Sequence, residues 1–286
     1  MEVAVTMTDG HTSARLESGD HVCFVFDSEE HRRSGVLQWA REGLAAGERV
    51  VSVESRRPNG AGANPGSLLT LLAQDGVDCA RHLANGQLKV MTPTETYSTH
   101  GRIDLPATFA AHRIFIEQTL AQGYPGVRMT ADVTLALDVL GTVDLLIDCE
   151  HRFDRLCQDF KLSGLCQYDS SHFVDETLTT IAEVHQGGIV DPQVHVARSG
   201  GVVRLIGEID CSNAHLLAGL LRGCDFEEPL VVDAAQLHFI DASGLRALAS
   251  VASRSNTGLH LVSADSHVQK VVGWCGFEHW LSPTTS

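Results

Sequence analysis

The stretch LHFIDASGLRA at residues 237–247 begins with the apolar residues of a buried strand and ends in the pattern of a helix. Asp241, Ser243 and Gly244 stand at the join. The free N–H groups of a first helical turn carry partial positive charge, so a phosphoryl group on Ser243 would meet donors there. Aspartate and serine are also ordinary N-cap residues, and the local pattern leaves both roles open. Gly244 would leave room for a second backbone.

The residues on both sides of this turn predict a small α/β domain. Two glycines at 200–201 mark a hairpin, and Ser212 is the expected N-cap of the helix that follows it. Strands and helices then alternate to the end of the chain. The expected strands are 194–210 (the hairpin), 229–237 and 258–265, and the expected helices are 212–224, 243–255 and 266–276.

Three stretches of this region carry a resemblance to a known family. They are VVRLIGEIDCSNAHLL (202–217), LVVDAAQLHFIDASGLRAL (230–248) and GLHLVSADSHVQKVVGWCGFEHWL (258–281). In content and order they resemble the STAS domain, the module of anti-sigma-factor antagonists and of sulphate-transporter tails. We therefore expect residues 194–286 to form a STAS α/β domain.

The resemblance to the antagonists implies a phosphorylation site. In those proteins a partner anti-sigma kinase phosphorylates the hydroxyl residue just before the glycine of the turn, which is Ser243 here. Ala242 stands where the family often has another serine, so the turn holds one acceptor hydroxyl. Phosphorylation adds about −1.5 to −2 charges and would release the partner. The implied partner-binding residues are Asp210, Asp233, Asp241, Ala242, Gly244 and Leu245.

The first two thirds of the chain also alternate short apolar runs with helical stretches. HVCFVF (21–26) is typical of a strand, and the apolar residues of 28–47 recur at three- and four-residue steps, as in a helix. This alternation indicates a mostly parallel sheet, with its ligand crevice at the carboxyl ends of the strands. Further strands are expected at 49–54, 87–92, 126–133 and 162–169, and further helices at 67–76, 105–124, 142–157 and 171–184.

A second resemblance rests on four stretches of this half. They are GDHVCFVFDSEEHRR (19–33), GERVVSVE (47–54), GVRMTADVT (126–134) and LLIDCEHRFDRLCQDFKLSGLCQYDSSHF (145–173). They resemble the MEDS domain, a prokaryotic sensory module related in outline to RecA-like ATPases. The resemblance implies a three-layer RecA-like domain at 15–186 that senses a small organic molecule. The glycine-rich phosphate loop of such ATPases is missing after the first strand, so we predict no nucleotide cofactor.

His21 and Cys23 lie two residues apart on the first expected strand, so their side chains face the same side of the sheet. One role open to these two residues is to bind a metal or a small molecule. The other is structural, with the Cys23 thiol packed in the core beside a hydrogen-bonded His21 imidazole. Two ligands are too few for a metal site, and we predict none. The expected ligand-binding residues are His21, Cys23, Glu150, Tyr168 and Asp169. Further candidates to converge with them are His31 and Cys166, and Arg128 is expected beside Glu150.

Composition limits the partners of the chain. A formal net charge of −15 argues against binding to nucleic acid or to anionic membranes. Eight cysteines without a C-x-x-C pair indicate reduced thiols in a cytoplasmic protein. No apolar run reaches the roughly 18 residues of a membrane span. We expect a disordered leader at 1–14 and a linker at 187–193.

The preferred hypothesis is a cytoplasmic anti-sigma-factor antagonist that is not an enzyme. Its STAS domain would be switched by phosphorylation at Ser243, and its MEDS domain would sense a small organic ligand. The expected partner is an anti-sigma factor or a serine kinase of that type, and a homodimer stays open. One alternative is an enzyme, or a metal- or thiol-based redox sensor, that uses His21 and Cys23. The other is a scaffold without a ligand in a stress-signalling complex.

Overall fold

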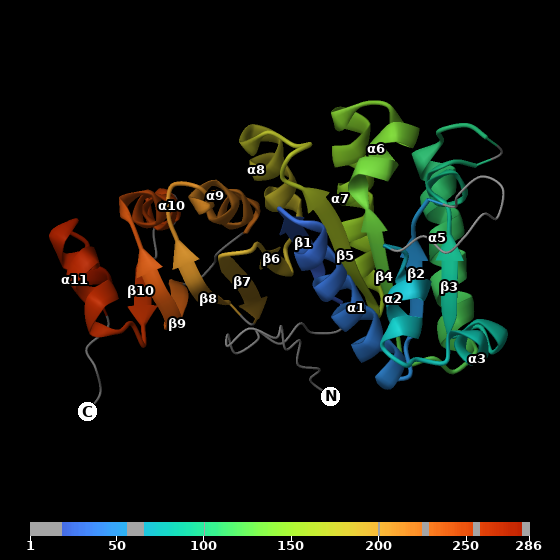
Figure 1. The fold of residues 1–286 in the computed structure, drawn as a ribbon. Helices are drawn as coiled ribbons and strands as arrows, with labels where there is room; N and C mark the ends of the chain where they lie inside the picture. Colours follow the sequence, from blue (N-terminus) through green and yellow to red (C-terminus); the bar gives the residue numbers. More distant parts are fainter. Residues whose placement is uncertain are drawn as a thin grey trace.

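The chain folds around one ten-stranded sheet, with the strand order β10-β9-β8-β7-β6-β1-β5-β4-β2-β3 (Figure 1). Neighbouring strands run parallel, except that β7 (Val194–Ser199) is antiparallel to both of its neighbours. The predicted α/β class with a mostly parallel sheet is therefore confirmed. The computed structural model describes residues 19–55, 66–99, 101–199, 201–224, 229–253 and 258–281.

The N-terminal half has three layers, with the central strand β1 (His21–Phe26) buried along its whole length. Val22 and Phe24 face α1 and α2 on one side of the sheet, while Cys23 and Val25 belong to the core under α5, α7 and α8 on the other side. Burial on both faces explains why every residue of this strand after His21 is apolar. The bounds are β2 (Arg49–Val53), β3 (Leu88–Met91), β4 (Val127–Asp132), β5 (Leu162–Asp169), α1 (Glu29–Ala45), α2 (Leu68–Gln74), α5 (Leu105–Ala121), α7 (Val143–Asp159) and α8 (Asp175–Val184).

Three short helices of this half were not predicted from the sequence. Thr92 and Glu95 form a reciprocal capping box at the start of one of them, and Asp132 caps another through the backbone N–H of Thr134. The expected strand 126–133 accordingly ends one residue early, at Asp132. These helices are too short to have a clear apolar periodicity, so only their caps were visible in the sequence. They are α3 (Cys79–Ala84), α4 (Pro93–Tyr97) and α6 (Val133–Leu140).

The segment expected to be a linker contains a buried strand, β6 (Gly188–Val190). It pairs in parallel with β1 and antiparallel with β7. Gly188 has φ +143°, and a Cβ at this position would overlap the carbonyl oxygen of Val196. The segment that the sequence predicted as the linker therefore includes a strand, and its glycines allow two strands to approach closely. The expected leader at 1–14 lies outside the described residues.

The C-terminal half continues the same sheet with a hairpin and two parallel strands. Apolar residues of its helices α9, α10 and α11 belong to the same continuous core as those of α7 and α8, so these helices cover the same face. The predicted order of elements is confirmed. Their bounds are β8 (Val202–Ile209), α9 (Ala214–Gly223), β9 (Leu230–Ile240), α10 (Ala242–Ala252), β10 (Leu259–Val262), α11 (Ser266–Trp274) and a 3₁₀ turn (Glu278–Trp280).

The two halves also meet where α8 packs against α9 (Figure 1). A Cβ at Gly219 would overlap the carbonyl oxygen of Thr179, and a Cβ at Gly223 would overlap that of Glu183. Two glycines one helical turn apart therefore allow the two helix backbones to touch. Together with β6, this contact makes the halves one packed unit.

We expect Gly219→Ala to destabilise the protein by roughly 1–3 kcal/mol, because the added methyl group must push α9 away from α8. Gly273→Ala is the matched control. Gly273 is also helical, but a Cβ there would meet nothing within 4 Å. This control should be neutral or stabilising by up to about 1 kcal/mol. Urea unfolding of both variants measures the difference, and equal stabilities would contradict the close contact.

Candidate functional site

Four metal-ligating side chains meet inside the N-terminal half, in what we call the His-Glu-Cys cluster. It consists of His21 from β1, Cys166 from β5, Glu150 from α7 and His185, the residue that follows α8. All four are buried, and one ligand atom of each lies within 4.8 Å of the others. Neighbouring strands β1 and β5 aim His21 and Cys166 at the same face of the sheet, where α7 covers them.

The Glu150 carboxylate is the centre of this cluster. Its Oε2 lies 3.2 Å from Nε2 of His21, 3.4 Å from Sγ of Cys166 and 3.7 Å from Nε2 of His185. Its Oε1 accepts a 2.8 Å hydrogen bond from the hydroxyl of Tyr168. Both oxygens of a fully buried carboxylate are therefore engaged, as burial of a charge requires.

An outer ring of groups orients the two imidazoles. Nδ1 of His21 lies 3.3 Å from a carboxylate oxygen of Asp154, and Nδ1 of His185 lies 2.8 Å from the carbonyl oxygen of Ile181. The rings stack with centroids 3.9 Å apart. Because each Nδ1 is held from outside, each Nε2 is directed toward Glu150.

The electrostatics of the cluster favour a charged pair in the absence of a metal. Burial raises the pKa of Glu150, but hydrogen bonding to His21 and the nearby histidines outweigh it and bring the value to about 2. Burial lowers the pKa of His21, yet its hydrogen bonds to Asp154 and Glu150 leave the pKa raised. Burial and the charge on His21 lower the pKa of His185 to about 3. The cluster then holds an ionised Glu150, a protonated His21 and a neutral His185.

The thiols of this region do not have the environment of reactive cysteines. Burial and the charge of Glu150 raise the pKa of both Cys23 and Cys166 well above the ordinary value. A nucleophilic or redox-active thiol needs a lowered pKa and access to solvent. The alternative of thiol chemistry at His21 and Cys23 is therefore disfavoured.

The structure brings together some of the predicted ligand residues and separates others. His21, Glu150 and Tyr168 meet as expected, with Cys166, whereas the Cys23 side chain packs in the core beside them. Asp169 lies outside the cluster at the end of β5, where it accepts hydrogen bonds from Ser171.

Two further expectations about this region were wrong. His31 packs against Phe24 on the opposite face of the sheet. Arg128 is not beside Glu150 but pairs with Glu48 at 2.8 Å and lies over the ring of Trp39. Arg128 therefore belongs to a structural ion pair under α1.

Sequence reasoning missed His185 and Asp154 as members of the site. Asp154 lies one helical turn after Glu150 on α7, so the spacing alone places both on one face. His185 gave no such signal, because it follows α8 and reaches the cluster only when β6 joins the sheet beside β1.

A small apolar cavity lies next to the cluster, beneath α5. It has a volume of about 140 Å³ and is lined by Met129, Phe153, Ile116 and His112, among others. A second void of about 20 Å³ shares His112, Met129 and Phe153 and reaches Glu150 and Cys166. Nδ1 of His112 is buried without a hydrogen-bond partner among the described residues. Lys89 and Glu95 also line the larger cavity, so its mostly apolar walls carry two charged side chains besides this imidazole nitrogen.

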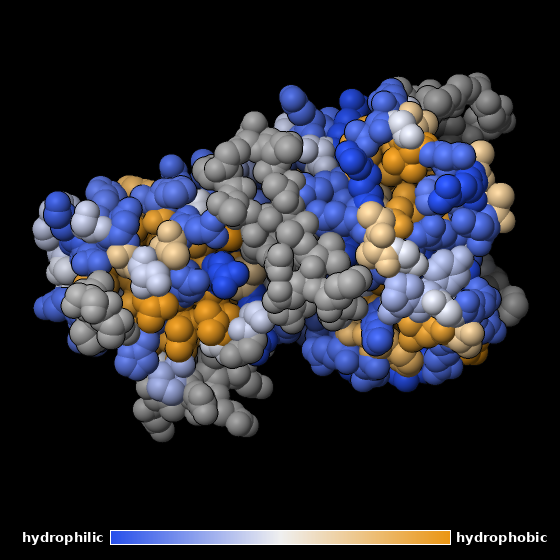
Figure 2. Space-filling model, turned by 90° about the horizontal axis from the view of Figure 1, so that it is seen from below, coloured by the Kyte–Doolittle hydropathy of each residue, from blue (hydrophilic) through white to orange (hydrophobic). Residues whose placement is uncertain are grey.

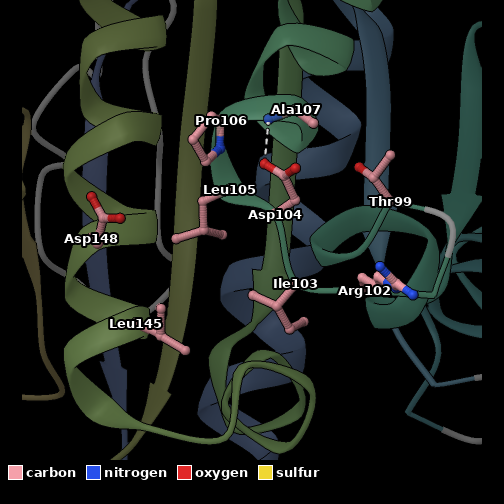
Figure 3. Close-up of a pocket in the computed structure, with 9 residues that line it drawn as sticks. All are labelled: Thr99, Arg102, Ile103, Asp104, Leu105, Pro106, Ala107, Leu145 and Asp148. Atoms are coloured by element: carbon pink, nitrogen blue, oxygen red, sulfur yellow. Dashed lines mark hydrogen bonds between the residues drawn. The ribbon is translucent and has the colours of Figure 1, made fainter.

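An open groove of about 920 Å³ lies between the start of α5 and α7 (Figure 3). Leu145 and Asp148 of α7 face Ile103 and Leu105 across it. The Asp104 carboxylate there accepts the N–H of Ala107 and so caps α5. No residue of the His-Glu-Cys cluster lines this groove. Its acidic residue Asp104 already has a structural role as the cap of α5.

The turn that carries Ser243 lies at the carboxyl edge of the sheet in the C-terminal half. Asp241, not Ser243, caps α10: one carboxylate oxygen accepts the N–H groups of Ser243 and Gly244 at 2.6 and 3.0 Å. The half-buried Ser243 hydroxyl accepts a 2.8 Å hydrogen bond from the guanidinium of Arg246. The first N–H donors are thus already occupied, so a phosphoryl group on Ser243 would have Arg246 as its counter-charge.

Only part of the predicted partner surface reaches this turn. Ala242 is exposed, and Asp210 and Asp241 follow the neighbouring strands β8 and β9, whose last residues pair. Asp210 accepts hydrogen bonds from Ser212, which is not the helix cap we expected. The charged residues of the turn are therefore Asp210, Asp241 and Arg246.

Three of the predicted contacts are corrected by the structure. Asp233 lies near the beginning of β9, paired with Arg204, and so is separated from Ser243 by the rest of the strand. Leu245 is fully buried in the core. A Cβ at Gly244 would overlap Ile209 and Ile240, so this glycine makes room for the chain's own strands and not for a partner.

The surface near the turn has an exposed aromatic side chain that sequence reasoning missed. Phe239 is 37% exposed and stacks on His267 of α11. Elsewhere hydrophilic residues cover much of the face shown in Figure 2, with apolar side chains reaching the surface in between. Burial of Phe239 was expected from its place in an apolar run, which cannot distinguish a strand end from a strand centre.

Comparison with protein families matches residues 20–186 to the profile described as "MEthanogen/methylotroph, DcmR Sensory domain", or MEDS. The chain belongs to the MEDS family. Residues 191–286 match the STAS domain, as the sequence predicted. The His-Glu-Cys cluster therefore lies in the MEDS domain, and the Ser243 turn lies in the STAS domain.

Other comparisons add little to this assignment. No curated protein matches the chain. A solved structure, flagellar accessory protein FlaH from Methanocaldococcus jannaschii, is similar with a TM-score of 0.39 and 11% identity over 73% of this chain and 87% of that chain. Within the described residues, no helix is long and apolar enough to span a membrane.

We expect Tyr168→Phe to destabilise the MEDS domain by roughly 1.5–3 kcal/mol, since Glu150 Oε1 would lose the donor that its buried charge requires. Tyr124→Phe is the control, because its hydroxyl donates to Asn85 O at an exposed position. This change should cost less than about 0.5 kcal/mol. Urea unfolding followed by fluorescence measures both, and an unchanged midpoint for Tyr168→Phe would show that the carboxylate does not need this hydrogen bond.

Proposed function

We propose that the chain is a non-enzymatic signalling regulator, in which a MEDS sensor controls a STAS antagonist of an anti-sigma factor. The observation that carries the proposal is the Ser243 turn: a single accessible serine at a helix start, on the carboxyl edge of a STAS sheet. The partner would be an anti-sigma factor with serine kinase activity. Eight free cysteines are consistent with a reducing compartment such as the cytoplasm.

The geometry of the turn supports a switch by phosphorylation. A phosphoserine carries about −1.5 to −2 charges, and it would stand beside the Asp241 carboxylate, which holds the N–H of the same residue. Arg246 offers one compensating charge. Phosphate on Ser243 would therefore leave excess negative charge at the contact and weaken binding to a partner that fits the unmodified turn.

The cavity beneath α5 supports a sensory role for the MEDS domain. Its volume of about 140 Å³ is close to that of cavities that hold one benzene-sized molecule. Mostly apolar walls, with one imidazole nitrogen that has no partner among the described residues, suit a small, mostly apolar organic molecule.

The packing between the halves provides a route from sensor to switch. Helix α8 ends at the cluster residue His185 and packs on α9 through Gly219 and Gly223. Helix α9 in turn contacts α10, which begins at the Ser243 turn. A ligand that shifts α7 or α8 would thus move the helix next to the phosphorylation site.

The switch is tested with candidate anti-sigma kinases and ATP. We expect the wild-type protein to acquire one phosphate per chain, Ser243→Ala none, and the control Ser250→Ala as much as the wild type. Ser250 is an exposed serine on the same helix. In binding assays, Ser243→Asp should lose at least about tenfold in affinity, which is roughly 1.4 kcal/mol. Equal affinities of Ser243→Asp and Ser243→Ala, or full phosphorylation of Ser243→Ala, would contradict the switch.

The cavity is tested with benzene as the probe in thermal unfolding. At about ten times its Kd, benzene should raise the Tm of the wild type by roughly 3 °C or more. Ala111→Trp, at an exposed position that lines the cavity, should block the entrance and abolish the shift. Ala110→Trp, an equally exposed neighbour on α5 that does not line it, should keep the shift. Equal responses of the two variants would contradict binding at this cavity.

A further inference from the structure

The four ligand atoms of the His-Glu-Cys cluster have the spacing of a metal coordination sphere. Four of the six distances between them are 3.2 Å (His21 Nε2 to Glu150 Oε2), 3.4 Å (His21 Nε2 to Cys166 Sγ), 3.4 Å (Cys166 Sγ to Glu150 Oε2) and 3.7 Å (His185 Nε2 to Glu150 Oε2), and all four atoms lie within 4.8 Å of one another. Zinc bonds of about 2.0–2.3 Å in a tetrahedron separate neighbouring ligand atoms by about 3.3–3.6 Å. These four distances lie within about 0.1 Å of that range.

The outer contacts of the cluster are those that metal-binding residues require. A zinc-binding histidine usually donates its other N–H to a carboxylate or a backbone carbonyl. His21 does so to Asp154, and His185 does so to the carbonyl of Ile181. The second oxygen of Glu150 is held by Tyr168. Each imidazole is thus held from outside, with its Nε2 near Oε2 of Glu150.

Hydrogen bonding alone leaves this arrangement poorly satisfied. Two imidazole nitrogens and one thiol crowd around a single carboxylate oxygen, which has two lone pairs. A divalent ion would instead accept all four groups. Its two charges would balance the Glu150 carboxylate and a Cys166 thiolate, so the buried site would be neutral.

We infer that His21, Glu150, Cys166 and His185 bind one zinc ion. The mixed nitrogen, oxygen and sulfur donor set suits zinc among the common divalent ions. Four protein ligands in a fully buried site leave no open position, so the ion has a structural role and not a catalytic one. This inference revises our prediction from sequence that the chain holds no metal, and it does not depend on the proposed STAS function.

The zinc would connect the core of the MEDS domain to the start of the junction strand. His21, Cys166 and Glu150 belong to β1, β5 and α7, whereas His185 lies three residues before β6. Zinc at this place would hold α8 and β6 against the sheet. Loss of the ion would therefore loosen the segment that leads into the STAS domain.

The test is the zinc content of the full-length protein, purified without chelators or metal-affinity resins. Mass spectrometry of the metal should find about one zinc per chain in the wild type. Cys166→Ser and His185→Ala should each fall below about a tenth to a fifth of that content, since loss of one such ligand strongly weakens zinc binding. Cys224→Ser is the matched control and should keep the wild-type content. Cys224 is another buried thiol, whose hydrogen bond to Leu220 O a serine can replace.

A second measurement decides the question even if the variants do not fold. Cobalt added to the metal-free wild type should give the strong visible bands of a four-coordinate site and a thiolate charge-transfer band, and zinc should raise the Tm of the same sample. A folded wild type that contains no zinc, shows no such bands and gains no stability from added zinc would overturn the inference. So would wild-type zinc content in a folded Cys166→Ser protein.

Discussion

One buried carboxylate organises the N-terminal domain. Glu150 lies in the middle of an apolar core, where an isolated charge would be prohibitively costly, so every lone pair must find a partner. Those partners come from strands β1 and β5 and from His185, which lies between α8 and β6. The need to satisfy this single charge therefore holds β1, β5, α7 and the end of α8 together.

The two domains are joined by close packing of their backbones. Strand β6 completes one sheet between β1 and β7, and the glycines of α9 let it lie directly on α8. Interfaces between domains of one chain are usually smaller and more polar than this continuous core. A change at the cluster would consequently reach the STAS domain through rigid elements in contact. A flexible connection would have absorbed the same change.

In the STAS domain, the helix cap at the Ser243 turn leaves the serine hydroxyl outside the cap. Asp241 satisfies the first N–H groups of α10 and leaves the Ser243 hydroxyl to Arg246 alone. Buried Gly244 and Leu245 fasten the helix to the strand ends beneath it. The serine is thus presented on a rigid support, and the charge around it is already finely balanced between Asp241 and Arg246.

The sequence by itself determined the α/β class, the order of most elements and the serine at the helix start, because periodicity, caps and turn residues are local. Its resemblance to known domains indicated both families. It also identified His21, Glu150 and Tyr168 as candidates. Only the tertiary structure decided that residues 188–190 form a strand, that His185 and Asp154 complete the cluster, and that Leu245 and Gly244 face inward. These outcomes depend on which strands become neighbours in the sheet. That pairing joins residues as far as 164 positions apart, from His21 to His185, which no local pattern encodes.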